Sequence, residues 1–155
     1  MAARDKITRE GKKFFKEIER LKKLQMQVGY QHGEAVNEDG ADVADIAMFN
    51  ELGTENIPAR PFLRQSVDNH ADKINAMCKA QLRGITSGSK TAEDALNALG
   101  VMQKGLVQNE IRNGSFVKNA PSTVARKHGS EQPLIDTGQM RDSVQYVIAK
   151  KGEGK

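Results

Sequence analysis

The chain has 155 residues, a formal net charge of +4 and a hydrophobic content of 37%, which fits one domain with a single core. Its longest apolar runs are only a few residues, which excludes a transmembrane helix, and no membrane partner is expected. The first residues lack the apolar segment of a secretory signal, and the single cysteine, Cys78, cannot form an internal disulfide, so a reducing cytoplasm is expected.

The chain opens with a basic amphipathic segment. Apolar residues recur at helical spacing over residues 4–24, with basic residues between them, which predicts a helix. Residues 25–30 then alternate between polar and apolar side chains, which is the period of a strand. The acidic, glycine-containing segment 31–40 follows as a predicted loop or hairpin tip.

A short helix and a rigid turn come next. Helix signals cover residues 41–52, and Gly53 is a typical stop because glycine readily adopts the left-handed conformation at a helix end. Pro58 and Pro61 exclude a helix around them, and Pro61 suits the first position of the helix that follows. That helix is predicted to run to about residue 82, with an apolar face made by Val67, Ala71, Ile74, Cys78 and Leu82.

The second half of the chain is expected to hold one more long helix and a late strand. Residues 84–89 break the helical pattern, and Thr91 with Asp94 predicts a capping box for a helix that ends at Asn113-Gly114. Residues 115–132 carry few apolar side chains and are expected to be irregular, either mobile or ordered by a neighbouring subunit.

A helical turn over residues 137–142 and the alternating Val144, Tyr146 and Ile148 close the pattern with a strand. The elements together predict an α+β fold, in which a small antiparallel sheet of the early and C-terminal strands packs against three long helices. We expect a single domain over residues 1–155, with a basic N-terminal helix (1–24), a core (25–149) and a flexible tail (150–155).

Charges are separated along the chain. Residues 1–24 hold nine basic and four acidic side chains, whereas residues 31–56 hold seven acidic side chains and neither Lys nor Arg. If the two patches lie on different faces, copies could dock head to tail, and such a contact makes a ring when it closes. Equally, both patches could be solvated helix surfaces.

Two residues of the rigid turn stand out. Arg60 lies between two prolines, so ordering it costs little, and it is expected to form a structural salt bridge with Glu51 or Glu55, or else to bind a carboxylate of a neighbour. Phe62 is expected to be an anchor, either in the core of this chain or in a pocket on a partner.

Two sequence blocks resemble one family. The first is Asn50-Glu51-Leu52-Gly53-Thr54 followed by Pro58-Ala59-Arg60-Pro61-Phe62-Leu63-Arg64, and the second is Pro133-Leu134-Ile135-Asp136-Thr137-Gly138-Gln139-Met140-Arg141-Asp142-Ser143-Val144. In this order, and in a chain this short, they are similar to the tail-completion or neck proteins of tailed bacteriophages, often called virion morphogenesis proteins. The resemblance spans roughly residues 24–149, and Met140 stands where that family more often has leucine.

The resemblance implies a structural protein of the virion rather than an enzyme. The expected role is tail completion, tail termination or a neck ring at the head–tail junction, with assembly in the host cytoplasm. Such proteins typically form a ring, here expected to be hexameric, that meets the tail tube and the head–tail connector and touches DNA without sequence specificity. No cofactor, metal or catalytic residue is implied. The residues expected to carry the motif and the assembly contacts are Glu51, Gly53, Thr54, Pro58, Arg60, Pro61, Phe62, Arg64, Asp136, Thr137 and Gly138.

Two other functions fit parts of the sequence. The basic segment 4–24 could bind DNA phosphates, as in a small nucleic-acid-binding protein, although no groove-reading motif accompanies it. Asp136-Thr137-Gly138 matches the catalytic triplet of aspartic proteases, which need a second carboxylate that a dimer could supply. Such enzymes are nearly all strand, however, and this chain reads as mostly helical. The alternative role for Asp136 or Thr137 is an N-cap for the turn that follows.

Overall fold

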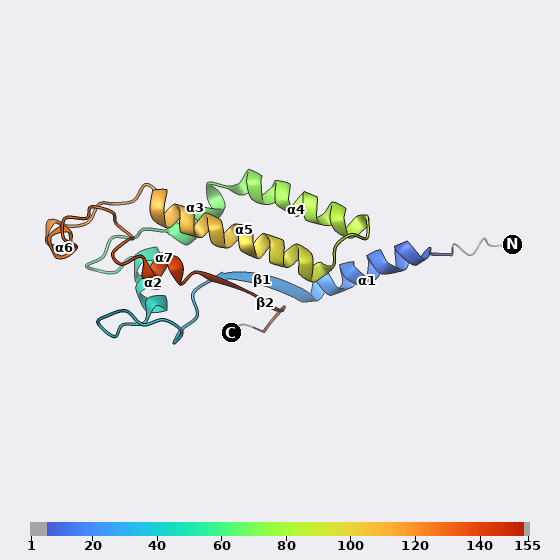
Figure 1. The fold of residues 1–155 in the computed structure, drawn as a ribbon, viewed down its shortest axis with the longest axis horizontal. Coiled ribbons are helices and arrows are strands. Elements are labelled where there is room, and N and C mark those ends of the chain that lie inside the picture. Colours follow the sequence, from blue (N-terminus) through green and yellow to red (C-terminus); the bar gives the residue numbers. More distant parts are fainter. Residues whose placement is uncertain (1–5, 154–155) are drawn as a thin grey trace. The chain divides into compact units, whose positions relative to one another are not determined.

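A computed structural model describes residues 6–153 of the chain (Figure 1). Within that range the elements follow in the order α1, β1, α2, α3, α4, α5, α6, α7 and β2. Strand β1 (Leu24–Gly29) pairs with β2 (Gln145–Lys150) in an antiparallel sheet. The prediction of an α+β fold with paired early and late strands is therefore confirmed. None of the helices in this part of the chain is long and apolar enough to cross a membrane.

The chain divides into two compact units that are interleaved in sequence. The described part of unit 1 consists of residues 6–27, 72–101 and 147–153, and unit 2 consists of residues 28–71 and 102–146. The boundaries fall inside β1, α5 and β2 and after the first residue of α4, so each of these elements contributes residues to both units.

Unit 1 begins with α1 (Arg9–Lys23), which Thr8 caps by accepting a hydrogen bond from the backbone N–H of Gly11 at 3.0 Å. The helix was expected from residue 4, but residues 6–8 are not helical, and Arg4 and Asp5 lie outside the described residues. A side-chain cap at Thr8 explains the later start, because it satisfies one of the first free N–H groups of the helix.

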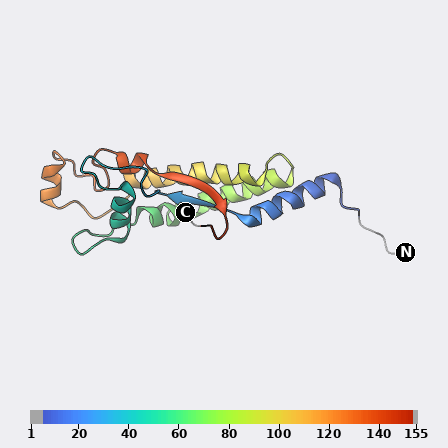
Figure 2. The ribbon, with the colours of Figure 1, turned by 90° about the horizontal axis from the view of Figure 1, so that it is seen from below.

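Besides its parts of β1 and β2, unit 1 contains a helical hairpin. Helix α4 (Ala71–Thr86) and the first part of α5 (Ala92–Asn113) run antiparallel and lie side by side in both views (Figures 1 and 2). The capping box is confirmed, since Asp94 N–H donates to Thr91 Oγ1 at 3.1 Å and Thr91 N–H donates to Asp94 Oδ2 at 2.9 Å. Helix α4 continues past the expected break at residue 84 as far as Thr86.

The helix expected from Pro61 to residue 82 is wrong in one respect, because the structure divides it. Helix α3 (Phe62–Asp68) ends in a turn at residues 69–70, and α4 begins after it. The turn interrupts the helical register, so the residues expected on one apolar face do not share a buried face. Val67 and Leu82 are 47% and 46% exposed, whereas the buried residues of these two helices are Phe62, Ser66, Gln81 and Ile85.

Unit 2 contains the short helices. Helix α2 (Val43–Leu52) follows the loop 31–40 as expected, with Asp42 Oδ1 accepting from the N–H of Ala44 at 2.8 Å. The segment 115–132 was expected to be irregular but contains α6 (Pro121–Arg126), with Pro121 at its first position. The backbone carbonyl of Gln132 accepts hydrogen bonds from Asn119 Nδ2 and Lys127 Nζ, which closes this segment on itself.

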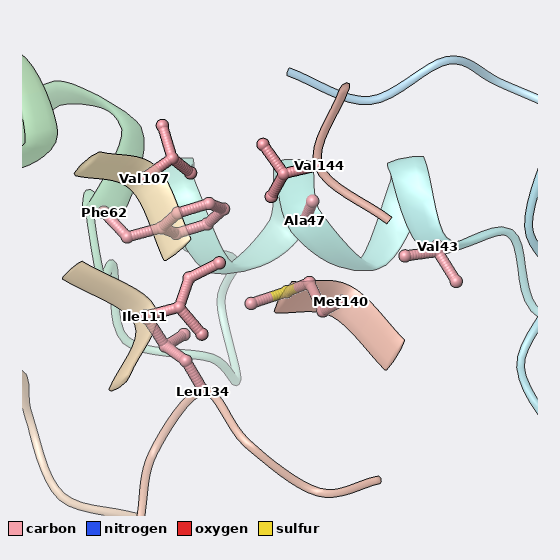
Figure 3. Close-up of a cluster of buried hydrophobic side chains, with 8 residues drawn as sticks. All are labelled: Val43, Ala47, Phe62, Val107, Ile111, Leu134, Met140 and Val144. Atoms are coloured by element: carbon pink, nitrogen blue, oxygen red, sulfur yellow. The ribbon is translucent and has the colours of Figure 1, made fainter. Parts of the chain in front are cut away.

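The core of unit 2 is one apolar cluster that α7 (Gln139–Asp142) completes. Figure 3 shows its eight buried side chains, which come from α2, α3, α5, α7 and the segments beside α7: Val43, Ala47, Phe62, Val107, Ile111, Leu134, Met140 and Val144. Close packing of this kind fixes the surrounding short helices, whose few backbone bonds could not hold them alone.

Candidate functional site: the elbow and its partner segments

The first family-like block, residues 50–64, forms a compact turn in unit 2 that we call the elbow. Gly53 ends α2 with a φ of 76°, and a Cβ at this position would lie 2.8 Å from the backbone nitrogen of Ala59. Both the dihedral angle and the close approach require glycine here. Thr54 Oγ1 accepts hydrogen bonds from the N–H groups of Asn56 and Ile57, and Thr54 N–H donates to Ile57 O at 2.8 Å. The elbow is therefore held by hydrogen bonds among its own residues.

Glu51 connects the two sides of the elbow. Its carboxylate accepts hydrogen bonds from the N–H of Leu63 at 2.8 Å and from the N–H of Arg64 at 3.1 Å. These are two of the free N–H groups at the start of α3, where a negative charge is also favoured by the helix dipole. Pro61 stands just before the helix, in the N-cap position, and contributes no side-chain cap of its own.

Arg60 does not form the salt bridge that the sequence suggested. The side chain is 6% exposed, and its guanidinium donates to neutral oxygens: Nε to Val117 O at 2.8 Å, Nη2 to Lys118 O at 3.3 Å and to Asn119 Oδ1 at 3.4 Å, and Nη1 to Asn50 Oδ1 at 3.4 Å. Glu51 is already engaged at α3, which explains why it is not the partner. Arg60 thus joins the elbow to the segment 117–119, which we call the partner strip.

The electrostatics around Arg60 follow from burial. Desolvation lowers the pKa of Arg60 from its ordinary value. Desolvation is also the main cause that lowers the pKa of Lys127, with the charge of Arg60 lowering it further while Asp136 raises it. A guanidinium stays protonated despite such a shift, so the buried charge depends on its carbonyl and amide partners for stabilisation.

Phe62 is anchored in the core of this chain, which decides between the two expected roles. Its side chain is fully buried and lies beside Val107 and Ile111 (Figure 3). The second family-like block reaches the same cluster through Leu134, Met140 and Val144. The two blocks are far apart in sequence, yet together they enclose one core.

A partly buried tyrosine connects the second block to the end of β1. Tyr30 Oη donates to the backbone carbonyl of Met140 at 2.8 Å, and its ring meets that of Phe62 edge-on with centroids 6.2 Å apart. Burial, and secondarily the charge of Glu51, raises the pKa of Tyr30 above its ordinary value. The phenol therefore stays protonated and keeps donating this hydrogen bond at physiological pH.

The remaining family-like residues divide into turn formers and surface residues. Gly138 adopts a φ of 85° at the N-cap of α7, so the expected capping by Asp136 is not observed. Thr137 Oγ1 accepts only a long hydrogen bond, at 3.4 Å, from the N–H of Gln139. Asp136, Thr137, Pro58 and Arg64 are exposed, and Asp136 and Arg60 both act on the charge of Lys127.

Sequence reasoning missed a polar cluster beneath the elbow. The fully buried Ser66 accepts a hydrogen bond from Gln103 Nε2 at 2.9 Å and donates to Leu63 O at 2.6 Å. Nearby, the buried Glu110 lies 3.7 Å from His70 Nδ1 and accepts from Asn69. A serine, a glutamine and a glutamate at helical positions predict a solvated face, so only the fold could reveal this network.

Two hollows lie in unit 2. One, of about 250 Å³, is lined by residues that include Tyr30, Glu34 and Ser143, and the other, of about 440 Å³, lies against α6 and the partner strip. Neither is lined by a histidine or a cysteine. Within residues 6–153, no group of three or more His, Cys, Asp or Glu side chains is placed to hold a metal ion.

Comparisons with known proteins add no relative: no protein-family model matches the chain, and neither the curated proteins nor the solved structures contain a significant match. The arrangement is therefore judged on its own geometry. The elbow residues cap a helix, close a turn and fill a core, so they hold segments of the chain in fixed positions.

Proposed function

We propose that this protein is a structural subunit of a phage virion at the head–tail junction, acting in tail completion, tail termination or as part of a neck ring. The observation that carries the proposal is the joint use of the two family-like blocks. Residues of both blocks line one core, and Glu51 and Arg60 of the elbow connect it to α3 and to the partner strip. In this role the protein works by fitting copies and neighbours rather than by turning over a substrate.

A rigid elbow suits assembly for a physical reason. Binding costs free energy when loops and side chains must be ordered, and a surface that is fixed beforehand avoids that cost. The glycine stop, the Thr54 turn and the Glu51 cap fix the backbone on one side of the core, and Arg60 fixes the partner strip beside it. Surfaces next to the elbow are therefore presented in one conformation.

The test combines mass measurement with negative-stain imaging of the purified protein, alone and mixed with phage tail tubes. We expect ring-shaped particles, or extra density at one end of the tubes. A protein that remains monomeric and binds neither tubes nor connectors would refute the proposal, as would a phage that stays fully infectious after deletion of the coding sequence.

A second candidate function is sequence-independent binding of DNA through α1. The observation in its favour is the row of exposed basic side chains on that helix: Arg9, Lys12, Lys16, Lys22 and Lys23. Binding of this kind weakens steeply as salt rises, because it releases condensed counterions from the phosphates. Duplex binding by a monomer, with affinity falling by orders of magnitude between low and physiological salt, would favour this candidate over the first.

A further inference from the structure

Three polar side chains of helix α1 contact its own unit. Lys13 Nζ donates to Gly88 O at 2.8 Å, Glu17 Oε2 accepts from the N–H of Ala92 at 2.8 Å, and Arg20 pairs with Glu93. These three residues of α1 recur at spacings of four and three, so they lie on one face of the helix. That face meets the turn between α4 and α5.

Another face of α1 leaves a large aromatic side chain in solvent. Phe15 is 55% exposed, and it lies between the exposed residues Lys12 and Lys16 in the sequence. Among the aromatic pairs in the described residues, Phe15 forms one, an edge-on contact with Phe14 at a centroid separation of 5.5 Å. Aromatic side chains are enriched at protein interfaces, and polar side chains form the rim around the buried centre.

Helix α2 carries a matching surface of opposite charge. Asp45, Met48, Phe49 and Leu52 follow each other at spacings of three, one and three, which places them on one side of the helix. Leu52 is 72% exposed, and Met48 and Phe49 are also exposed, whereas the other side of α2 buries Val43 and Ala47 in the core. The apolar stripe is bounded by Asp45 and by Glu55 in the segment that follows, and residues 31–56 contain no Lys or Arg.

We propose that α1 of one copy docks on the stripe of α2 in a second copy, with Phe15 against Met48, Phe49 and Leu52 and with Lys12 and Lys16 facing Asp45 and Glu55. The occupant is a second copy because this chain itself supplies the basic apolar helix that the acidic apolar stripe requires. The inference rests on the proposed function and specifies how its subunits join. Since the two surfaces differ, the contact is heterologous and leads to a ring or a filament rather than an isolated dimer.

The electrostatic part can be tested by exchanging the charges. Variant A carries Lys12→Glu and Lys16→Glu, and variant B carries Asp45→Lys and Glu55→Lys. Alone, each variant places like charges across the contact, so we expect its association constant to fall by at least about tenfold in sedimentation velocity. An equimolar mixture of A and B restores both contacts in alternating order, and we expect association of the mixture to return to the wild-type level.

Controls separate this contact from general charge effects and from misfolding. Lys73→Glu with Lys79→Glu makes the same charge change as variant A on exposed positions of α4, and we expect it to associate like the wild type. Leu52→Ser tests the apolar part without changing charge, and we expect a loss of association with an unchanged circular dichroism spectrum and melting temperature. Each variant is accepted only if it melts as the wild type does.

The outcomes distinguish the interface from the function. If variants A and B and Leu52→Ser all associate and cap tail tubes like the wild type, the interface is refuted while the proposed function stands. If the mixture of A and B fails to recover association, the pairing of α1 with α2 is refuted. If variant A loses DNA binding and keeps self-association, α1 is a nucleic-acid surface and the proposal is overturned. A wild-type chain that stays monomeric at millimolar concentration also overturns it.

Discussion

Replacement of Arg60 by lysine should loosen the link between the elbow and the partner strip. Lysine keeps the positive charge but offers a single nitrogen, so it cannot reproduce a fork that reaches Val117 O, Lys118 O and the amides of Asn50 and Asn119. Hydrogen bonds from a charged donor contribute about 1.5–3 kcal/mol each, and three of the four are long, so we expect a loss of roughly 2–3 kcal/mol in the free energy of unfolding.

The assay is urea denaturation followed by circular dichroism, together with hydrogen exchange over the partner strip. With a slope of about 2 kcal/mol per molar urea, the midpoint of Arg60→Lys should fall by roughly 1 M. Arg64→Lys makes the same change at an exposed position and should leave the midpoint nearly unchanged. If both variants unfold like the wild type, and exchange over residues 117–119 is not accelerated, the reasoning about Arg60 is refuted.

The remaining predictions concern the core, the glycine stop and the capping box. Phe62→Ala should reduce the free energy of unfolding by about 3–5 kcal/mol, whereas Phe49→Ala, at an exposed position, should cost less than about 1 kcal/mol in the same urea experiment. Gly53→Ala should lower the melting temperature because it adds strain of about 1–3 kcal/mol, while Gly105→Ala, with open space in the middle of α5, should raise it slightly. Hydrogen bonds from Thr91 lower the pKa of Asp94. The contribution of Asp94 to the free energy of unfolding is therefore present above the ordinary pKa of a carboxylate and is lost as pH falls through the lowered pKa. Asp94→Asn should remove this part of the acid dependence when stability is measured as a function of pH.

Local signals predicted the elements that depend on a few neighbouring residues. The capping box at Thr91, the stop at Gly53 and the strand patterns at both ends of the chain each follow from short-range chemistry, and the structure confirms all of them. The turn that divides the long helix at residues 69–70 contains no proline or glycine, and Asp68 and Asn69 are the only local residues that favour a turn there. Tertiary packing decided that boundary, since α3 buries Phe62 and Ser66 in unit 2.

The sequence predicted which residues form the candidate site but not which atoms they contact. The prolines and glycine around Arg60 indicated a rigid turn, and Phe62 was recognised as an anchor. Two of the four partners of Arg60 are the backbone carbonyls of Val117 and Lys118, and a carbonyl leaves no mark in the sequence because every residue has one. An acidic side chain such as Glu51 can be read from the sequence as a partner for arginine. The free N–H groups at the start of α3, which Glu51 binds instead, cannot be read from the sequence.

The interleaving of the two units restricts how this protein can be divided. The chain passes from one unit to the other after Gln27, Ala71, Val101 and Tyr146, so no single cut yields a fragment that contains one whole unit and nothing else. Expression of the N-terminal or C-terminal half should therefore give insoluble or unfolded material, and recombination between related genes could not exchange either unit as a cassette. The surface of such a protein therefore has to change by single substitutions, each of which keeps both units folded.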